Sequence, residues 1–248
     1  MNLYGLIGYP LGHSFSKQYF ADKFEREGLS DCFYEAFPIP SIDHFSTLIK
    51  ENSNLKGLNV TIPYKEQVLK FVTKLTDEVK YIGAANCIKI NGDQLVAFNT
   101  DIIGFEHSFY QMLQPNHKKA LVLGTGGSSK AVQYVLRKLG IKFLLVTRTE
   151  DLKEGYINYN MIDEKIMEEY LVIINCSPVG MSPNENLHPD IPYQFINPAH
   201  YLYDLVYKPS KTLFLQKGEA KGAIIQNGYK MLLLQAEASW KIWNSDLY

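Results

Sequence analysis

The sequence is poor in cysteine, and its charges form no cluster of one sign. The chain of 248 residues has three cysteines, Cys32, Cys87 and Cys176, which lie far apart and make no C-x-x-C pair. This pattern excludes a disulfide framework and a zinc or thiol-exchange site built on paired cysteines, so we expect buried thiols in a reducing cytosol. Lysine and arginine number 25 against 26 aspartates and glutamates, and they are scattered. Such a chain has no electrostatic footprint for nucleic acid, and a small neutral or anionic ligand fits better.

The chain also lacks long hydrophobic runs and a basic leader. No apolar stretch approaches the length of a membrane span. The opening MNLYGLIGYPLGHS turns polar too early for a signal sequence. We therefore expect a cytoplasmic protein without a membrane segment. The six histidines show no H-E-x-x-H or similar ligand spacing, so we expect no metal.

Short apolar runs alternate with helical patterns in the first part of the chain. The periodicity predicts strands at 3–9, 32–37 and 55–60, and helices at 14–27, 41–51 and from Tyr64 onward. This β-α-β order predicts a mostly parallel sheet. Two β-rich runs around Asn91-Gly92-Asp93 predict a hairpin, and so an antiparallel element in the same sheet.

The later part of the chain contains a dinucleotide-binding pattern. After a predicted helix from Asp101 to about Gln114, a strand ending at Leu123 leads through a glycine-rich turn into a helix and a second strand that ends at Thr147. Further strands are predicted at 170–177, 200–207 and 222–228, and a long amphipathic helix at 228–243. Together with the chain length, this predicts an α/β protein of two domains, one of them a Rossmann domain.

The glycine-rich turn is GTGGSS, residues 124–129. Gly124 and Gly126 remove the Cβ atoms that would keep the backbone from a pyrophosphate, and the helix start supplies N–H groups. Ser129 replaces the third glycine of the usual fingerprint. The alternative is a tight turn without a ligand, which the surrounding βαβ pattern disfavours. The cofactor-binding residues expected in this turn are Gly124, Thr125, Gly126, Gly127 and Ser128.

The end of the second strand, VTRT, indicates which dinucleotide is bound. A carboxylate at this place takes the ribose 2′-hydroxyl of NAD, whereas an arginine takes the 2′-phosphate of NADP. We therefore expect NADP, held by Arg148 with Thr147 and Thr149. The acidic Glu150 and Asp151 just beyond leave open a solvated arginine without a ligand.

Eight motifs in order give the chain a resemblance to the shikimate dehydrogenase family over nearly its whole length. They are GYPLGHSFS (8–16), NVTIPYK (59–65), GAANC (83–87), NTDIIG (99–104), GTGGSS (124–129), NCSPVGM (175–181), YDLVYKP (203–209) and NGYKMLLLQ (227–235). The resemblance implies NADPH-dependent reduction of 3-dehydroshikimate to shikimate, in aromatic amino acid (chorismate) biosynthesis. It also implies a substrate domain at 1–104, completed by a C-terminal helix at 228–248, and a Rossmann domain at 105–227.

By matching position, the resemblance implies that Lys65 and Asp101 are the catalytic pair. A carbonyl that receives hydride becomes an alkoxide and needs a proton, which an ammonium group can supply. On the residues alone, Lys65 could equally be a solvated lysine and Asp101 a helix cap. The other implied ligands are Ser14 and Ser16 for the substrate carboxylate, Thr61, Asn86, Tyr207 and Gln235 for the substrate, and Met181 and Gly228 beside the nicotinamide.

The chain departs from the family pattern in several places. Lys17 stands where proline is usual, Cys87 where threonine is common, and Thr147 where asparagine is usual, while Leu152 or Lys153 replaces a further arginine. The stretch 150–170 is shorter than is usual in the family, so we expect a missing or trimmed helix on the Rossmann sheet. Three rivals stay open: a quinate/shikimate dehydrogenase that uses NAD, a non-catalytic ligand sensor, and a folate-type dehydrogenase. A monomer or weak homodimer is expected.

Overall fold

The computed structural model describes residues 1–12, 15–150 and 152–245. Backbone contacts divide the chain into two compact units. The first unit comprises Met1–Thr100 and Ala236–Tyr248, and the second comprises Asp101–Gln235. The domain limits expected from the sequence, 1–104 with 228–248 and 105–227, stay a prediction.

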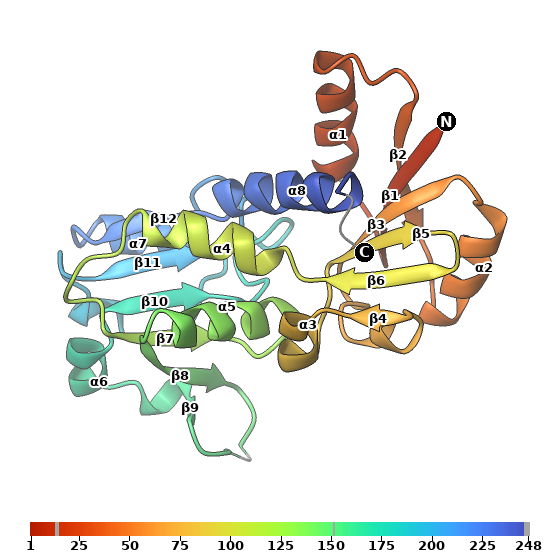
Figure 1. Cartoon of the computed structure of the whole chain (residues 1–248). Helices are drawn as coiled ribbons and strands as arrows, with labels where there is room; N and C mark the ends of the chain where they lie inside the picture. The colour runs from red at the N-terminus through yellow and green to blue at the C-terminus, as the bar shows by residue number, and fades with distance from the viewer. Residues whose placement is uncertain (13–14, 151, 246–248) are drawn as a thin grey trace. The chain divides into compact units, whose positions relative to one another are not determined.

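The first unit contains a six-stranded sheet in the order β2-β1-β3-β5-β6-β4 (Figure 1). Its elements are β1 (Asn2–Gly8), α1 (Phe15–Arg26), β2 (Cys32–Pro38), η1 (Ile42–His44), α2 (Phe45–Glu51), β3 (Leu55–Val60), η2 (Gln67–Lys70), β4 (Lys74–Leu75), α3 (Asp77–Ile82), β5 (Cys87–Asn91) and β6 (Gln94–Phe98). The β1 strand pairs in parallel with β2 and β3, whereas β5 is antiparallel to both β3 and β6. The expected hairpin is confirmed: Asn91 faces Gln94, and Gly92 has a φ of 58° in the turn.

The helix expected from Tyr64 onward is wrong. Only the 3-10 helix η2 forms there, followed by β4 and α3, neither of which was predicted. The carbonyl of Lys65 accepts a hydrogen bond from the Ala85 N–H at 2.8 Å instead of from the fourth residue along a helix. Leu69 donates to the carbonyl of Glu66 at 3.4 Å, which gives the tighter 3-10 turn. A new helix then starts at α3, where the Thr76 side chain accepts from the Val79 N–H.

The last residues of the chain complete the core of the first unit. The Trp243 ring lies 5.1 Å from the Tyr4 ring, centroid to centroid, and its Nε1 donates to the Ile88 carbonyl at 3.0 Å. A Cβ atom at Gly57 would lie 2.3 Å from the indole Cδ1. Glycine at this strand position therefore lets the indole pack directly on the sheet.

The second unit is a parallel sheet in the order β12-β11-β10-β7-β8-β9 (Figure 1). Its elements are α4 (Asp101–Tyr110), β7 (Lys119–Leu123), α5 (Gly127–Lys138), β8 (Lys142–Thr147), β9 (Tyr156–Asn158), η3 (Tyr159–Met161), α6 (Glu164–Glu169), β10 (Val172–Asn175), η4 (Tyr193–Phe195), β11 (Tyr201–Asp204), α7 (Leu213–Glu219), β12 (Ile224–Gln226) and α8 (Tyr229–Trp243), of which α8 continues into the first unit. Counted from β7, this is the doubly wound order 3-2-1-4-5-6, so the α/β fold class with a Rossmann domain is confirmed.

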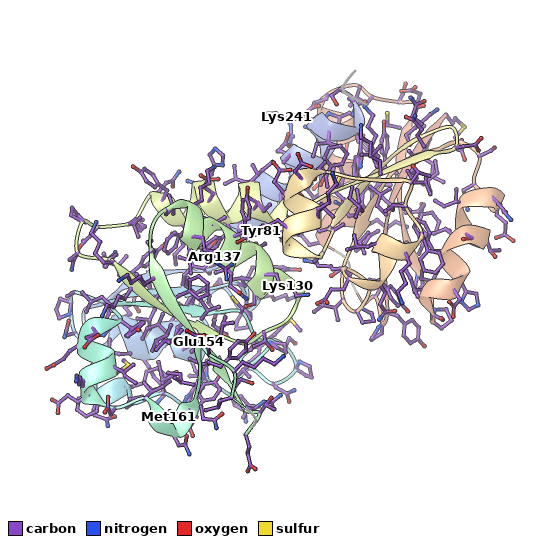
Figure 2. The ribbon with its side chains drawn as sticks, turned by 60° about the horizontal axis from the view of Figure 1, so that its bottom comes forward. Tyr81, Lys130, Arg137, Glu154, Met161 and Lys241 are labelled. Carbon is purple, nitrogen blue, oxygen red and sulfur yellow. The ribbon has the colours of Figure 1, made fainter. Side chains whose placement is uncertain are left out.

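Of two helices in the second unit whose lengths the sequence predicted, one agrees with the structure and one is shorter than predicted. The α6 helix has 6 residues, which agrees with the trimmed helix expected from the short stretch 150–170. The α4 helix ends at Tyr110, earlier than the predicted Gln114. On α5, Figure 2 shows Lys130 and Arg137, and the Arg137 guanidinium lies 4.9 Å from the centre of the Phe143 ring. Among the described residues, no helix is long and apolar enough to cross a membrane.

Candidate active site

The glycine-rich turn joins β7 to α5, at the point where the strand order of the sheet reverses. Gly124 has a φ of 106°, which favours glycine, and a Cβ there would lie 3.4 Å from the Ser177 backbone nitrogen. Gly126 is the N-cap of α5, has no side-chain cap, and would direct a Cβ into open space. No acidic residue lies in the first turn of α5. Backbone N–H groups at this helix start can therefore receive a pyrophosphate, and the residues present fit a dinucleotide.

Ser129, at the third fingerprint position, is fully buried. Its hydroxyl accepts a hydrogen bond from the Gln133 amide at 3.2 Å. A small side chain here lets α5 pack closely on the sheet, as the sequence pattern suggested.

The end of β8 carries the three residues expected at the adenosine ribose. The Thr149 N–H donates to the Thr147 hydroxyl oxygen at 3.2 Å, so the strand end forms a fixed turn. The Asn158 amide, with its nitrogen toward the backbone, donates to the carbonyls of Thr147 and Thr149 at 2.8 and 3.0 Å. Arg148 is exposed, and its positive charge acts on the nearby Tyr159 phenol to lower a pKa that burial raises. Arg148 thus stands beside the glycine turn, just past the end of the neighbouring strand β8, able to meet a phosphate. Asp151 lies outside the described residues.

Three further predicted residues follow strands β10, β11 and β12, which form the other half of the same sheet. Met181 comes after β10 and is exposed, Tyr207 comes after β11 and is half-buried, and Gly228 comes after β12. Burial raises the pKa of the Tyr207 phenol. A Cβ at Gly228 would lie 2.1 Å from the Leu205 carbonyl oxygen, so glycine is required there for backbone packing. All three positions lie at the carboxyl edge of the sheet, where doubly wound folds bind their ligands.

In the first unit, Thr61 and Lys65 follow the carboxyl end of β3. The Thr61 N–H donates to the Ile7 carbonyl at 2.9 Å, and a Cβ at Gly8 would lie 2.5 Å from the Thr61 Cγ2. Glycine at position 8 therefore lets the end of β3 approach the end of β1. The buried Tyr64 donates to the Ile39 carbonyl at 2.7 Å and anchors the segment that carries the half-buried Lys65.

Asn86 is held in one orientation by the segment that leads to Asp101. Its Oδ1 accepts from the Thr100 N–H at 2.6 Å and from the Thr100 hydroxyl at 3.2 Å. The Asn99 amide donates to the Ala84 carbonyl at 2.9 Å, so the two segments run together. The two bonds fix the orientation of the Asn86 amide, with Oδ1 toward Thr100.

Asp101 is buried and is the first residue of α4, where the helix dipole stabilises its carboxylate. Gly104, one turn later on the same face, allows α8 to approach: a Cβ there would lie 2.5 Å from the Met231 carbonyl oxygen and 3.2 Å from the Gln235 Cβ. Gly104 and Gln235 therefore belong to one contact between α4 and α8. Lys65 and Asp101 fall in different units, and their pairing stays a prediction.

The serine pair is only partly described. Ser14 lies outside the described residues, whereas Ser16 is the second residue of α1 and hydrogen-bonds the Tyr34 phenol. Burial raises the pKa of Tyr34 well above its ordinary value, so its hydroxyl remains a neutral donor. It donates to the Asn59 Oδ1 at 2.8 Å. The α1 helix has no acidic residue in its first turn, which suits a carboxylate ligand.

A largely buried polar chain, which no sequence pattern indicated, links these residues inside the first unit. From Tyr34 it runs to Asn59, whose amide donates to the Ser239 hydroxyl at 2.9 Å, and on to the Thr100 hydroxyl 3.2 Å away. Thr100 then reaches Asn86, as described above. Asn59 and Ser239 were detectable as polar residues inside apolar runs, but only the strand register shows that they meet.

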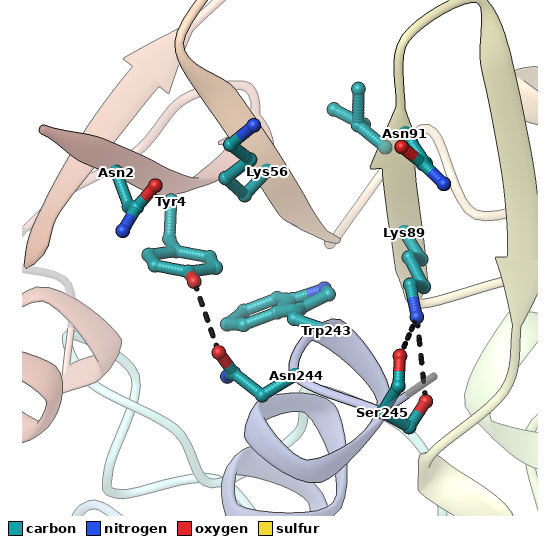
Figure 3. Close-up of a pocket in the computed structure, with 9 residues that line it drawn as sticks. Asn2, Tyr4, Lys56, Lys89, Asn91, Trp243, Asn244 and Ser245 are labelled. Carbon is teal, nitrogen blue, oxygen red and sulfur yellow. Dashed lines mark hydrogen bonds between the residues drawn. The ribbon is translucent and has the colours of Figure 1, made fainter. Parts of the chain in front are cut away.

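The pocket shown in Figure 3 lies elsewhere on the first unit. Its volume is about 390 Å³, and it lies at the starts of β1 and β3, beside Asn2, Tyr4 and Lys56. The Lys89 ammonium donates there to the Ser245 carbonyl. The predicted site residues follow the opposite ends of the same strands, so this pocket marks where the end of α8 docks on the sheet. Among the described residues, no group of three metal-ligating side chains occurs.

A glycine turn at the switch point of a doubly wound sheet defines the second unit as a dinucleotide-binding domain. Residues 6–88 match the family model of the shikimate dehydrogenase substrate binding domain. The chain is 35% identical to shikimate dehydrogenase (NADP(+)) of Caldicellulosiruptor saccharolyticus, over 96% of this chain and 90% of that protein. It is 33% identical to the Clostridium botulinum enzyme of the same name, over 96% and 95%. The chain belongs to the shikimate dehydrogenase family.

Solved structures agree with this assignment. The shikimate 5-dehydrogenase of Thermus thermophilus, in complex with NADP(H) and shikimate, has a TM-score of 0.87 and 30% identity, covering 98% of this chain and 94% of that one. A quinate dehydrogenase of Corynebacterium glutamicum, in complex with NAD, has a TM-score of 0.86 at 22% identity and covers 98% and 93%. The second likeness is one of fold alone.

Proposed function

We propose that the protein catalyses the reversible, NADPH-dependent reduction of 3-dehydroshikimate to shikimate. The observation that carries this proposal is the match to NADP-dependent shikimate dehydrogenases over 96% of the chain. The donor set at the carboxyl edge of the Rossmann sheet supports it, because glycines, a helix start and Arg148 suit a phosphorylated dinucleotide. The proposed occupant of the first unit is the polyhydroxy acid substrate.

The proposed chemistry is a proton transfer coupled to hydride transfer. NADPH, when bound, supplies the hydride. Lys65 donates the proton that the developing alkoxide needs during reduction, and accepts it back during oxidation. The Asp101 carboxylate, buried at the start of α4, orients Lys65 and a substrate hydroxyl.

The remaining residues hold the substrate. In this proposal, Ser14 and Ser16 bind the carboxylate at the start of α1. Asn86, whose amide Thr100 holds in one orientation, contacts a ring hydroxyl. Thr61, Tyr207 and Gln235 complete the ring of polar contacts, and Met181 and Gly228 lie beside the nicotinamide.

NADP is the proposed cofactor. Arg148 gives the strand end a positive charge, which favours a 2′-phosphate over a bare ribose hydroxyl. Thr147 and Thr149 are held in a turn by Asn158 and can add hydroxyl donors. No nucleic acid or membrane partner is proposed; a cytoplasmic monomer or weak homodimer stays a prediction.

The test follows the reduction of NADP+ and of NAD+ by absorbance, each with shikimate and with quinate. We expect the highest kcat/KM for shikimate with NADP+. A preference for quinate with NAD+ would instead support the quinate branch of the family. Ligand binding without turnover in any combination would support a sensor.

Replacing the proposed acid separates catalysis from binding. Lys65→Ala should lower kcat by roughly 10²–10⁴-fold, while the dissociation constant for shikimate changes little. Lys70→Ala, an exposed lysine in η2 a few residues away, is the matched control and should behave as wild type. Near-normal turnover in Lys65→Ala would remove the lysine from the mechanism.

A further inference from the structure

Asp204 is a fully buried carboxylate at the end of β11. Among the described residues, no ion pair includes it. A buried charge without an opposite charge is costly unless hydrogen bonds replace its water. Three donors do so: the Asn175 amide and the Val206 N–H reach Oδ1, each at 3.0 Å, and the Thr212 hydroxyl reaches Oδ2 at 2.5 Å.

The first donor connects Asp204 to the loop after β10. The Asn175 amide also donates to the Val179 carbonyl at 3.2 Å, which fixes the turn just before Met181. Gly180 has a φ of 89°, and a Cβ there would lie 3.4 Å from the Thr212 Cβ. The Asn175 amide thus fixes this loop, and Gly180 lets the loop pass close to Thr212. Both Asn175 and Thr212 donate to Asp204.

The second donor connects Asp204 to the loops after β11 and β12. Val206 gives its N–H to Asp204, and its carbonyl accepts from the Gly228 N–H at 3.2 Å. The close approach of Gly228 to the Leu205 carbonyl keeps the start of α8 on this segment. Tyr207 is the next residue along. One carboxylate thus joins the three loops that carry Met181, Tyr207 and Gly228.

We propose that Asp204 is a positioning residue that holds the loops after β10, β11 and β12 in the arrangement that cofactor binding requires. This inference rests on the proposed function, because it takes these loops to border the nicotinamide. Asp204 itself touches neither ligand in this proposal. Its ionised form is the one that matters, since a proton on the carboxyl group would replace one of its acceptor positions by a donor.

The protonation state offers a readout that a purely structural role would not move. Burial raises the pKa of Asp204 to about 6, against the opposing effect of its three hydrogen bonds. The titratable groups that face it are Cys176, Tyr193 and Tyr203, and burial raises the pKa of each, so they stay neutral around pH 6. Asp204→Asn mimics the protonated side chain, because its amide NH2 is a donor. In wild type, the Oδ2 atom at this place accepts from the Thr212 hydroxyl.

The experiment compares the KM for NADP+ of wild type and Asp204→Asn, with saturating shikimate, between about pH 5 and about pH 8. The 2′-phosphate of NADP+ titrates in this range too, so the ratio of the two KM values is the quantity to follow. We expect a ratio of roughly ten at the alkaline end, falling toward one at the acid end as wild-type Asp204 is protonated. Asp163→Asn, at the exposed cap of α6, is the control and should give a ratio of one throughout.

A second pair of variants covers the case in which Asp204→Asn does not fold. Thr212→Val removes one donor and should raise the KM for NADP+, while Thr212→Ser keeps the hydroxyl and should restore the wild-type value. If the wild type is active, either of two results overturns the positioning role. One is an Asp204→Asn to wild-type KM ratio of one at the alkaline end, and the other is a KM for NADP+ that Thr212→Val leaves unchanged. A wild type that does not oxidise shikimate with NADP+ overturns the proposed function instead.

Discussion

Burial of Asp204 predicts a specific dependence of stability on pH. Its pKa is about 6 in the fold and 3.8 in the reference state, so the folded protein binds the proton more tightly than the unfolded chain. The stabilisation is therefore fully present below pH 3.8 and is lost as the pH rises through about 6. In this window Asp204 makes the protein less stable as the pH increases.

The size of the effect follows from these two pKa values. Between about pH 5 and about pH 8, the free energy of unfolding should fall by roughly 1–2 kcal/mol through this one group. The side chain is fully buried, so solvent screening does not reduce the figure. His117 and His200 have pKa values lowered by burial and act in the opposite direction, which makes a reference protein necessary.

Asp204→Asn is that reference, because it keeps every other titratable group. Urea unfolding of both proteins, followed by circular dichroism, gives the difference in their free energies of unfolding at each pH. We expect the wild type to lose roughly 1–2 kcal/mol relative to the variant from the acid to the alkaline end of the range. A difference that does not change with pH would refute the burial argument.

Three further predictions rest on single contacts. Arg148→Asp should reverse the cofactor preference, so that kcat/KM with NADH exceeds that with NADPH; equal use of both by wild type would contradict the role given to this strand end. Thr100→Val should raise the KM for shikimate roughly three- to tenfold, because Asn86 loses one of the bonds that orient it. An unchanged KM would show that the orientation of Asn86 by Thr100 does not affect substrate binding. Gly57→Ala should lower the free energy of unfolding by about 3 kcal/mol, since its Cβ meets the Trp243 indole, and thermal unfolding measures this.

Much of the second unit could be predicted from local sequence. The GTGGSS turn between a strand and a helix already indicates the parallel sheet, and the later apolar runs follow it in the usual order. In the first unit, Asn91 and Gly92 specify the hairpin because the turn needs a positive φ. The segment after Tyr64 could not be read in this way. Its helical pattern is overridden by the Ala85 N–H, which takes the Lys65 carbonyl and lies far along the chain.

The candidate site shows the same division between local and distant signals. The residues proposed to contact ligands stand in motifs, and the resemblance locates them by position. Tyr34 and Ser239 stand in none of the eight motifs, and Asn59 opens NVTIPYK without a ligand role of its own. The contacts of these three residues come from strand register and from a helix that returns from the other end of the chain. A polar side chain within an apolar run is the available cue, but it does not say which partner the side chain meets.

The motifs themselves combine chemistry with packing, and the structure separates the two. Gly104 in NTDIIG and Gly228 in NGYK lie in motifs that carry the proposed ligand-binding residues. A Cβ at Gly104 would nevertheless lie 2.5 Å from the Met231 carbonyl oxygen, and a Cβ at Gly228 would lie 2.1 Å from the Leu205 carbonyl oxygen. Asp204 in YDLVYKP likewise binds loop donors, while Tyr207 in the same motif is the proposed ligand contact. The polar groups of the site are therefore positioned by neighbouring residues in the same motifs, such as glycines that allow two backbone segments to approach closely. A protein that keeps Lys65 and Asp101 but loses these supports should fold less accurately around its ligands, even though its chemical groups are complete.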